Sequence, residues 1–473
     1  MAHDMREFIE SLESRGLLRR VKAEVSPLLE VPEILRRVMY AHGPAVLFEN
    51  VRGHPGWRIV GNLFCCDEAV KVALGVSSVD EVGQRVSSLL RAAGGDLRSA
   101  MAYVALTPRS ASRAEFVEDP SVNLSSLPAF KTWPKDGGRY LTYPLVVHYE
   151  EVDGRRSVNF GVYRVMIVND REAVVHMQTY KRGFEEWQHV AQAGGCEMKA
   201  AIVIGAPPEV LLAGAMPAPK GVDKYVLASI VGNRPVELYT LPSGVPVPSS
   251  AEVVLEGTLD LCDLREEGPF GDHIGFYDVP DRRFPTFKLE RSYVRPNPIY
   301  YGTVVGRPPL EDSVIGRVSE RAFLPLIRFL FPEVVDVRFP ESGWFQGLAL
   351  VSIDKTMPGQ AKRVAMGLLG LGQFSLTKII VVVDKDIDLR SADQVTWAVS
   401  TFVDPARDLV VVNGAPADEL DLSTLPRRRV GSKLIVDATR KLRDELGAEP
   451  PEELRPDPET ERLVSSRWKE YGL

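Results

Sequence analysis

The sequence predicts a mixed α/β protein in which a strand-rich central part separates two parts that combine helices and strands. Helical spacing of apolar residues opens the chain, short strand-like runs divided by turn residues fill residues 141–304, and helices alternate with strands after residue 306. A length of 473 residues exceeds one ordinary hydrophobic core and suggests two or three domains, and with these changes of pattern we expect domains at residues 1–120, 121–305 and 306–473.

The N-terminal part should begin with an amphipathic helix, because apolar residues recur at helical spacing: Met5, Phe8, Ile9 and Leu12. Asp4 is a suitable N-cap for this helix and Gly16 a suitable stop. Strand-like runs follow at residues 45–51 and 57–63, so this part is predicted to be an α/β unit.

The central part should be a barrel or a sandwich, because such folds bury many short strands. Strands are predicted at residues 143–149, 158–168, 173–179, 200–204, 252–259, 286–294 and 299–304. In the C-terminal part, predicted helices at 318–331, 361–369 and 392–402 alternate with strands at 348–353, 379–383 and 409–412. This alternation is typical of an α/β domain, and the tail after Ala448 should be an extended arm or a short helix.

The composition limits the kinds of molecule that the protein is expected to bind and the compartment in which it is expected to lie. The net charge of -7 and the absence of a basic run argue against nucleic-acid binding. No signal-peptide pattern and no apolar run of about 20 residues is present, so we expect a cytoplasmic protein without a membrane span. Four cysteines are too few for a disulfide framework and fit a reducing cytoplasm: Cys65, Cys66, Cys196 and Cys262. Sparse Asn and Gln beside plentiful Arg and Glu are typical of proteins from hot environments.

Two segments carry residue types suited to catalysis. In the predicted strand around residues 159–164, Asn159 and Tyr163 share one face, and Arg164 faces the other way unless a bulge intervenes. The loop at residues 266–273 holds Glu267 and Asp272 between Gly and Pro residues, and such rigid loops can separate acid and base roles. The alternatives are an ordinary strand with an exposed Arg and a solvated acidic turn.

Three further positions are ambiguous when each is taken alone. Arg182 and Gly183 could bind a phosphate through a guanidinium and a closely approaching backbone, or could form a surface turn. Glu237 is an ordinary strand carboxylate by itself, and His176 on an apolar strand is more often a core histidine than a ligand.

The order of these motifs resembles the UbiD family of prenylated-flavin-dependent decarboxylases. The similarity runs from the Asn159 to Arg164 segment through Lys181-Arg182-Gly183, Glu237 and the Glu267 to His273 loop. It continues in the C-terminal part through the segments at residues 306–309, 360–363, 404–408 and 431–433.

The resemblance implies a three-domain subunit with a central split β-barrel that binds the flavin and a C-terminal α/β domain that dimerises. Prenylated FMN would come from a separate flavin prenyltransferase, with Mn²⁺ and often K⁺ linking its phosphate to the protein. Asn159 and Glu237 would hold the metal. Many relatives have a histidine where this chain has Lys181, and His176 is the candidate replacement for that ligand. The residues expected to contact the flavin are Val162, Tyr163, Arg164, Met177, Gln178, Thr179, Arg182 and Gly183.

The resemblance also implies the catalytic set Arg164, Glu267 and Asp272. Arg164 would orient the substrate carboxylate, Glu267 would pair with Arg164, and Asp272 would protonate the carbon that CO2 leaves. The flavin would supply the electron sink that an unsaturated acid lacks. The expected reaction is therefore the non-oxidative decarboxylation of an α,β-unsaturated acid.

A basic loop suggests the substrate. Lys131, Lys135 and Arg139 could receive a substrate phosphate, or could form a solvated loop. An archaeal branch of the family decarboxylates trans-anhydromevalonate 5-phosphate to isopentenyl phosphate in isoprenoid biosynthesis, which makes this ester the leading substrate. The alternatives are 4-hydroxy-3-polyprenylbenzoate or another aromatic or acrylic acid, a redox flavoenzyme, and a flavin- and metal-binding protein without catalysis.

Overall fold

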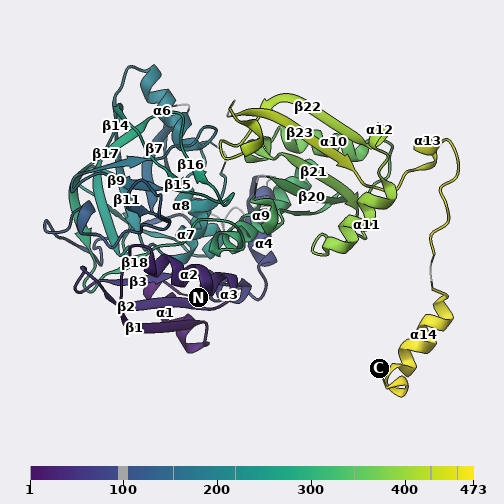
Figure 1. The fold of residues 1–473 in the computed structure, drawn as a ribbon, viewed down its shortest axis with the longest axis horizontal. Helices are drawn as coiled ribbons and strands as arrows, with labels where there is room; N and C mark the ends of the chain where they lie inside the picture. The colour runs from purple at the N-terminus through teal and green to yellow at the C-terminus, as the bar shows by residue number, and fades with distance from the viewer. Residues whose placement is uncertain are drawn as a thin grey trace.

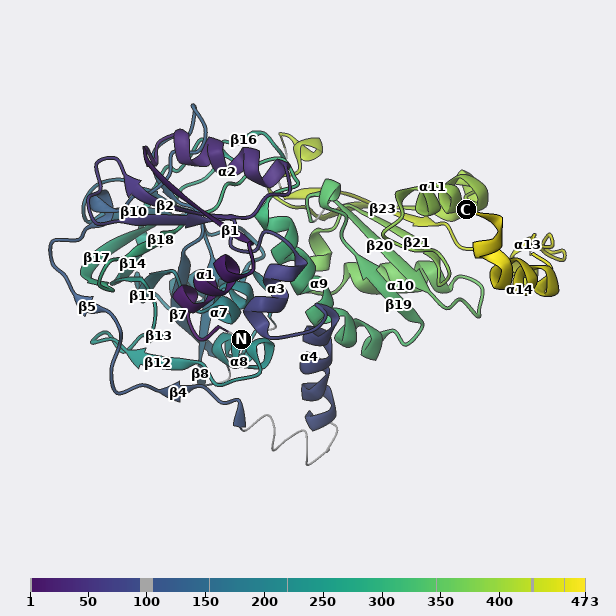
Figure 2. The same cartoon turned by 90° about the horizontal axis from the view of Figure 1, so that it is seen from below.

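The computed structural model describes residues 2–93, 105–152, 154–218, 220–345, 347–426, 429–454 and 456–472. The N-terminal and central parts form one body and the C-terminal sheet forms another (Figure 1). Helices α4 (Asp80–Ala93) and α9 (Glu311–Leu330) lie between the two bodies in both views (Figures 1 and 2). The mixed α/β class predicted from the sequence is confirmed.

The N-terminal helix α1 (Met5–Ser14) forms as predicted. The Asp4 side chain accepts a hydrogen bond of 2.8 Å from the backbone N–H of Glu7, and all four predicted apolar residues are buried. The adjacent sheet has the order β1 (Leu18–Val25), β2 (Ala45–Val51), β3 (Arg58–Gly61) and β18 (Ile299–Tyr301), with helices α2 (Glu30–Tyr40) and α3 (Asp67–Leu74). Its last strand follows the central part in sequence, so the chain returns to complete this sheet.

The central sheet curls into a half-barrel with the strand order β6-β9-β10-β17-β14-β11-β7-β8, and β5 pairs with β17. The strands are β5 (Val117–Glu118), β6 (Tyr140–Leu141), β7 (Leu145–Val152), β8 (Arg155–Val162), β9 (Val165–Ile167), β10 (Glu172–Val175), β11 (Glu197–Ile204), β14 (Val253–Arg265) and β17 (Phe284–Val294). Two small sheets flank it: β13 (Pro246–Pro248) with β12 (Glu237–Thr240) and β4 (Arg109–Ser110), and the hairpin β15 (Phe270–Gly271) with β16 (Tyr277–Asp278).

The single strand predicted at residues 158–168 is wrong, because two strands occupy this segment. β8 ends at Val162 as the partner of β7, and β9 begins at Val165 as the partner of β10. Tyr163 and Arg164 form the passage between these two pairings, so strict side-chain alternation does not extend across them. This break directs Arg164 into the site described below.

Helices α6 (Arg182–Gln192), α7 (Pro208–Ala215) and α8 (Lys224–Gly232) were not predicted. Helices α7 and α8 are buried along nearly their whole length, so they lack the polar face that produces a helical period in a sequence.

The C-terminal sheet has the order β19 (Val334–Arg338), β20 (Leu348–Ile353), β21 (Ile379–Asp384), β23 (Val430–Asp437) and β22 (Leu409–Pro416). Its helices are α10 (Gln360–Leu369), α11 (Ala392–Phe402), α12 (Pro405–Asp408) and α13 (Arg443–Leu446), and α14 (Pro458–Arg467) stands apart on the extended tail (Figure 1). Short 3-10 turns are η1 (Leu124–Ser126), η2 (Glu341–Gly343), η3 (Gly372–Leu376), η4 (Leu422–Thr424) and η5 (Trp468–Tyr471). Over the described ranges, no helix is both long enough and apolar enough to cross a membrane.

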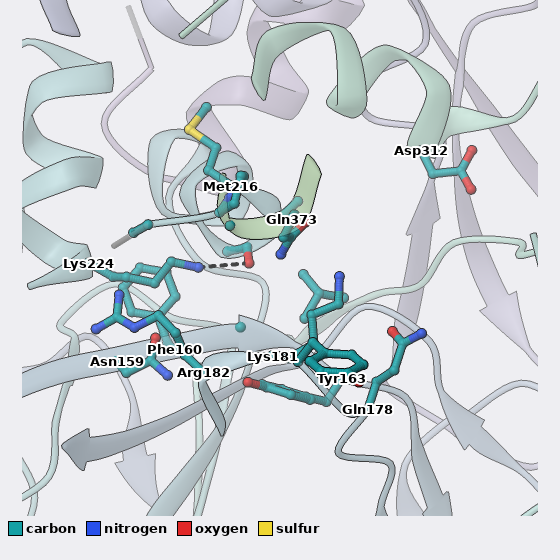
Figure 3. A pocket seen from close by; sticks show the side chains of 18 of the residues that line it. Asn159, Phe160, Tyr163, Gln178, Lys181, Arg182, Met216, Lys224, Asp312 and Gln373 are labelled. Atoms are coloured by element: carbon teal, nitrogen blue, oxygen red, sulfur yellow. Dashed lines mark hydrogen bonds between the residues drawn. The ribbon is translucent and has the colours of Figure 1, made fainter. Parts of the chain in front are cut away.

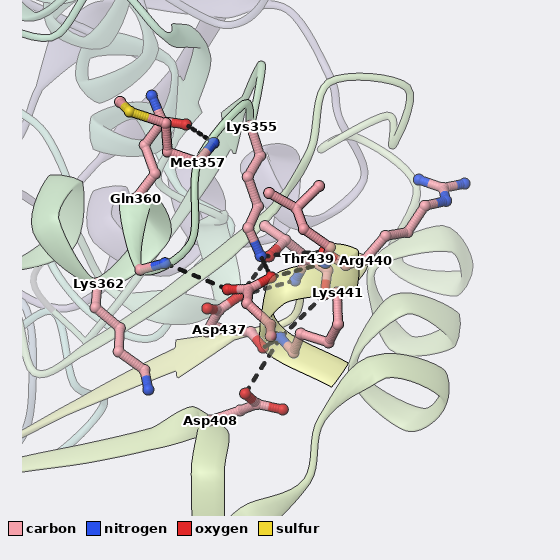
Figure 4. Close-up of polar contacts among 12 residues, drawn as sticks. Lys355, Met357, Gln360, Lys362, Asp408, Asp437, Thr439, Arg440 and Lys441 are labelled. Atoms are coloured by element: carbon pink, nitrogen blue, oxygen red, sulfur yellow. Dashed lines mark hydrogen bonds and ion pairs between the residues drawn. The ribbon is translucent and has the colours of Figure 1, made fainter. Parts of the chain in front are cut away.

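Several motifs of the C-terminal part form a buried polar cluster in this domain (Figure 4). Lys441 Nζ lies 3.1 Å from Asp437 Oδ1 and 3.3 Å from Asp408 Oδ1. The side chain of Lys362 in α10 donates a hydrogen bond of 2.6 Å to the carbonyl of Arg407 in α12. These contacts join the end of β23 to α12 and the start of α10, so the motifs at residues 360–363 and 404–408 stabilise the domain.

A disulfide that the sequence did not predict joins Cys196 to Cys262, with their Cα atoms 5.3 Å apart. It links the start of β11 to β14, whereas Cys65 and Cys66 are free. Intracellular proteins of hyperthermophiles are an exception to the rarity of disulfides in reducing compartments, so few cysteines alone do not exclude one.

Replacing both Cys196 and Cys262 by Ser should lower the free energy of unfolding by about 2–4 kcal/mol, because the bond closes a long loop of the unfolded chain. Guanidinium unfolding under oxidising conditions measures the difference. Reduced wild-type protein should match the double variant. Equal stability of the oxidised wild type and the variant would show that the bond does not form.

Candidate active site

A cavity of about 670 Å³ lies between the half-barrel, helices α6 to α9 and loops of the C-terminal domain. Its polar lining includes Asn159, Lys181, Arg182 and Lys224 (Figure 3), together with Arg164 and Asp272. Apolar side chains of α9 and of the segment around η3 line the remainder. A cavity of this size, with apolar surface beside convergent polar and charged groups, suits a bound cofactor or small ligand.

Three carboxylates surround the buried guanidinium of Arg164. Glu267 accepts two hydrogen bonds, at 3.0 Å from Nε and 2.7 Å from Nη2. Asp272 Oδ2 lies 2.5 Å from Nη1, and Asp278 Oδ2 lies 2.7 Å from Nη2. The structure thus brings together the three residues of the expected catalytic set and adds Asp278, which the sequence analysis missed.

The hairpin of β15 and β16 explains how these acids converge. Phe270 pairs with Asp278 across the hairpin, which brings Asp278 back beside the loop that carries Glu267 and Asp272. The ring of Phe270 also lies 4.7 Å from Cζ of Arg164, a cation–π contact. No sequence signal marks Asp278, because its role depends on the hairpin register.

Glu267 and Asp272 differ in their access to the cavity. Asp272 lines it, whereas Glu267 does not and lies buried with Arg164 and His176, whose Nδ1 is 3.0 Å from Glu267 Oε2. Burial raises the pKa of Glu267, but the charge of Arg164 and hydrogen bonds from His176 and Arg164 outweigh it and hold the pKa at about 2. Glu267 therefore serves as a fixed anion that holds Arg164, and His176 is engaged with that anion.

His273 is a charged neighbour of Asp272. Its Nδ1 lies 2.6 Å from Asp312 Oδ2, and its Nε2 lies 3.7 Å from Asp272 Oδ1. Burial lowers the pKa of His273, but the hydrogen bond to Asp312 and the charges of Asp272 and Asp312 raise it to about 9. At neutral pH this histidine is protonated, and it lines the cavity beside Asp272.

The opposite side of the cavity is cationic (Figure 3). Lys224 starts α8 and is buried, with its Nζ donating a hydrogen bond of 3.1 Å to the carbonyl of Gly214 and lying 5.4 Å from the ring of Phe160. Arg182 starts α6 and donates to the buried carboxylate of Glu150 and to the carbonyl of Val222.

The residues expected to contact a flavin divide into two groups. Val162, Tyr163, Arg164, Gln178 and Arg182 line the cavity. The others do not: Met177 is fully buried, Thr179 donates to Glu419, and Gly183 packs against Tyr163. A Cβ on Gly183 would lie 2.4 Å from the hydroxyl of Tyr163, so glycine is required there for packing.

The two expected metal ligands are not together. Asn159 lines the cavity and lies 3.3 Å from Nε2 of His148, whereas Glu237 is exposed on the small sheet at β12 and does not line the cavity. Within the described residues, no group of three or more Asp, Glu, His or Cys side chains could hold a metal ion. The structure therefore does not bring Asn159 and Glu237 together at the cavity, and this pair does not fit the Mn²⁺ site that the resemblance implied.

The basic loop packs against the hairpin of β15 and β16, where Asp136 accepts a hydrogen bond of 3.0 Å from the backbone N–H of Gly271, but its cationic side chains do not reach the cavity. Lys131, Lys135 and Arg139 do not line it, and Arg139 donates a hydrogen bond of 3.0 Å to the carbonyl of Ser125. The structure thus does not bring these three residues to the position expected for a substrate phosphate.

A loop of the C-terminal domain closes over the site. Gln178 donates a hydrogen bond of 3.0 Å to Asp418, and Arg282 lies 3.2 Å from Glu419. Leu420 of the same loop lines the cavity. Residues of both the central part and the C-terminal domain therefore form the cavity.

Comparison with known proteins gives matches along the whole chain. Three domains of the 3-octaprenyl-4-hydroxybenzoate carboxy-lyase family match: the N-terminal domain at residues 9–86, the Rift-related domain at 106–308 and the C-terminal domain at 313–438. An uncharacterized protein of Aeropyrum pernix is 53% identical, and the alignment covers 99% of each chain.

Solved structures match at lower identity. Vanillic acid decarboxylase of Sedimentibacter hydroxybenzoicus in its closed form is 25% identical, with a TM-score of 0.88 over 100% of this chain and 99% of the other. Its open form gives a TM-score of 0.78 at 26% identity over the same shares. The UbiD-class enzyme HmfF of Pelotomaculum thermopropionicum in complex with FMN is 26% identical, with a TM-score of 0.79 over 98% of this chain and 100% of the other. The present arrangement is more similar to the closed form.

Proposed function

Because the chain belongs to the UbiD family of carboxy-lyases, we propose that it is a decarboxylase that binds prenylated FMN and removes CO2 from an α,β-unsaturated carboxylic acid. The observation that carries this proposal is the cluster in which buried Arg164 meets Asp272 at the cavity and Glu267 behind it. Flavin binding alone does not require an Arg between two acids at this place, which argues against a non-catalytic role.

The cavity supports a flavin in two ways. Cations at one side and the N-terminus of α6 suit its phosphate, because backbone N–H groups and positive side chains both favour an anion. Apolar side chains along the remaining wall suit its ring system. Once bound, prenylated FMN would supply the sink for the electron pair that departing CO2 leaves.

Arg164 would bind the substrate carboxylate, because its Nη1 reaches the cavity side where Asp272 lies. A substrate carboxylate there places a second negative charge beside Asp272, and neighbouring like charges favour protonation of one of them. Asp272 would then deliver that proton to the carbon after CO2 leaves. Protonated His273, 3.7 Å away, is positioned to supply Asp272 with the next proton.

For the substrate we place trans-anhydromevalonate 5-phosphate first, with isopentenyl phosphate as the product. Support comes from the four Lys and Arg side chains that, besides Arg164, line the cavity among the described residues, more than the roughly two charges of a flavin phosphate require: Lys181, Arg182, Lys220 and Lys224. The alternative is 4-hydroxy-3-polyprenylbenzoate or another aromatic or acrylic acid, for which the apolar residues of α9 would be the contact surface.

The proposal includes a homodimer and a separate flavin prenyltransferase that supplies the cofactor. Exposed apolar side chains on the edge strand β22 and its neighbour support dimerisation through the C-terminal domain, since such a surface is typically covered: Leu409, Val411, Val412 and Val430.

Production of the protein together with a flavin prenyltransferase tests the function. We expect mass spectrometry and the ultraviolet-visible spectrum of the released cofactor to show prenylated FMN. The loaded protein should release CO2 from the phosphate ester faster than from polyprenylbenzoate, and the apoprotein should release none. Exclusive recovery of ordinary FMN, with no acid decarboxylated, would contradict the proposal.

A further inference from the structure

We propose that the flavin phosphate is held in this protein by the side-chain cations Lys181, Arg182 and Lys224, and that no divalent metal ion takes part in binding it. The inference rests on the proposed flavin-binding function. It concerns the cavity side that also contains Asn159, where the resemblance implied Mn²⁺.

Lys224 is the main observation. It is 4% exposed, lines the cavity, and among the described residues makes one side-chain hydrogen bond, to the carbonyl of Gly214. A buried ammonium has capacity for three hydrogen bonds, and a carbonyl does not neutralise its charge. Burial lowers the pKa of Lys224 well below its usual value, and the charges of Arg182 and Lys181 lower it further. A lowered pKa marks an ammonium that lacks a compensating anion, and a bound phosphate would supply that anion.

The carboxylates near Lys224 are already engaged. Glu150 is buried and accepts hydrogen bonds from Arg182, from the backbone N–H of Gly221 at 2.9 Å and from Ser157 at 3.1 Å. Asp223 caps α8 and accepts a hydrogen bond of 3.1 Å from the backbone N–H of Val158. Neither carboxylate is among the residues that line the cavity.

The carboxylates that line the cavity also offer few free ligands for a divalent ion. Among the described residues these are Glu185, Asp272 and Asp312. Asp272 pairs with Arg164 and Asp312 with His273, which leaves exposed Glu185 on the same helix as Arg182. Hard ions such as Mn²⁺ prefer several oxygen ligands, and one carboxylate beside Lys181, Arg182 and Lys224 does not outweigh the repulsion between these cations and a metal ion.

A phosphate dianion, by contrast, fits these charges directly. Arg182 presents a planar guanidinium and Lys224 a compact ammonium, the two groups that proteins most often use for phosphate. Arg182 is held in place by Glu150, and Lys224 by the first turn of α8, so the cations are positioned before the phosphate arrives. The protein would therefore provide the charge that a metal ion provides elsewhere.

Binding of unmodified FMN to the full-length apoprotein tests this inference through flavin fluorescence, apart from activity. In metal-free buffer with EDTA we expect the wild type to bind FMN, with a Kd that Mn²⁺ changes by less than about twofold, below the effect of one charged hydrogen bond. Metal analysis of the FMN-loaded protein should find no stoichiometric manganese.

Substitution of Lys224 provides the matched variants. Lys224→Glu should weaken FMN binding in EDTA by about 100-fold or more, because the charge is reversed beside the phosphate, and Mn²⁺ should restore part of the loss by linking the new carboxylate to the phosphate. Lys224→Met removes the charge, keeps the stem, and should weaken binding without rescue by Mn²⁺. Lys22→Glu, at an exposed position on β1, controls for net charge.

The outcomes separate this inference from the proposed function. Wild-type binding that disappears in EDTA and returns with one Mn²⁺ per flavin would overturn the inference and leave the flavin function intact. Absence of FMN binding with and without Mn²⁺ would overturn both. If Lys224→Glu does not fold, the wild-type EDTA titration and Lys224→Met still decide the question.

Discussion

Asp272→Asn should lower kcat by about 10²–10⁴, because the variant keeps the shape of the side chain and loses the proton that general acid catalysis requires. Asp272 is the member of the Arg164 cluster that both lines the cavity and carries a transferable proton when protonated. Steady-state turnover and solvent-deuterium incorporation into product, with bound cofactor verified, measure the effect.

Asp278→Asn is the matched control for this substitution. Asp278 is also a carboxylate on Arg164, at 2.7 Å, but it does not line the cavity. We expect a much smaller loss of turnover and unchanged deuterium incorporation. Wild-type turnover and deuterium incorporation in Asp272→Asn would show that another group gives the proton, and His273 would be examined next.

Arg164→Met should destabilise the protein by about 3–5 kcal/mol at pH 7 and abolish decarboxylation, because it leaves buried carboxylates without their cation. Glu267, Asp272 and Asp278 all contact this guanidinium, and all are buried. Urea unfolding at fixed pH measures the free energy of unfolding of both proteins. A decarboxylation assay of the variant tests the second expectation, because the variant lacks the guanidinium that would bind the substrate carboxylate.

The free energy of unfolding should change with pH in opposite directions in the wild type and in Arg164→Met. In the wild type the pKa of Glu267 is held at about 2, so its contribution is present above the ordinary pKa near 4.3 and is lost as pH falls toward 2. In Arg164→Met the same buried carboxylates should bind protons more readily in the folded state than in the unfolded state. The variant should therefore gain stability as pH falls from about 8 to about 5.

Arg265→Met is the control for this second prediction. Arg265 also pairs with two carboxylates, Glu172 and Asp263, but its side chain is 33% exposed. Surface ion pairs contribute about 0–1 kcal/mol, so we expect a small loss of stability without an inverted pH slope. A similar small loss in Arg164→Met would contradict the assigned role of the buried cluster.

The sequence predicted those elements that are amphipathic or bounded by clear turns. The bounds of β2, β20 and α11 match the predicted ranges because each of these segments is delimited by turn or capping residues. Helices α7 and α8 were missed because burial on all sides removes the periodic signal. The break at Tyr163 depends on pairing with β7 and β10, partners that local pattern does not identify.

The sequence predicted the site residues that belong to recognised motifs and missed those outside them. The motifs placed Arg164, Glu267 and Asp272 in one site, and the structure brings them together. Asp278 requires the hairpin register, and Lys224 appears in the sequence as an ordinary charged residue at the start of an apolar helix. Glu237 was expected at the site from the order of the motifs, but its strand belongs to a small flanking sheet and its side chain does not line the cavity.

The most direct test of the central claim is the reaction of cofactor-loaded protein with trans-anhydromevalonate 5-phosphate and the alternative acids in D2O, without nicotinamide. We expect one acid to yield CO2 and product in equal amounts, with one deuterium at the carbon that carried the carboxyl group. Asp272→Asn should show both at a rate lower by about 10²–10⁴. A loaded wild type that releases no CO2 from any of these acids, or only with a nicotinamide, would contradict the account.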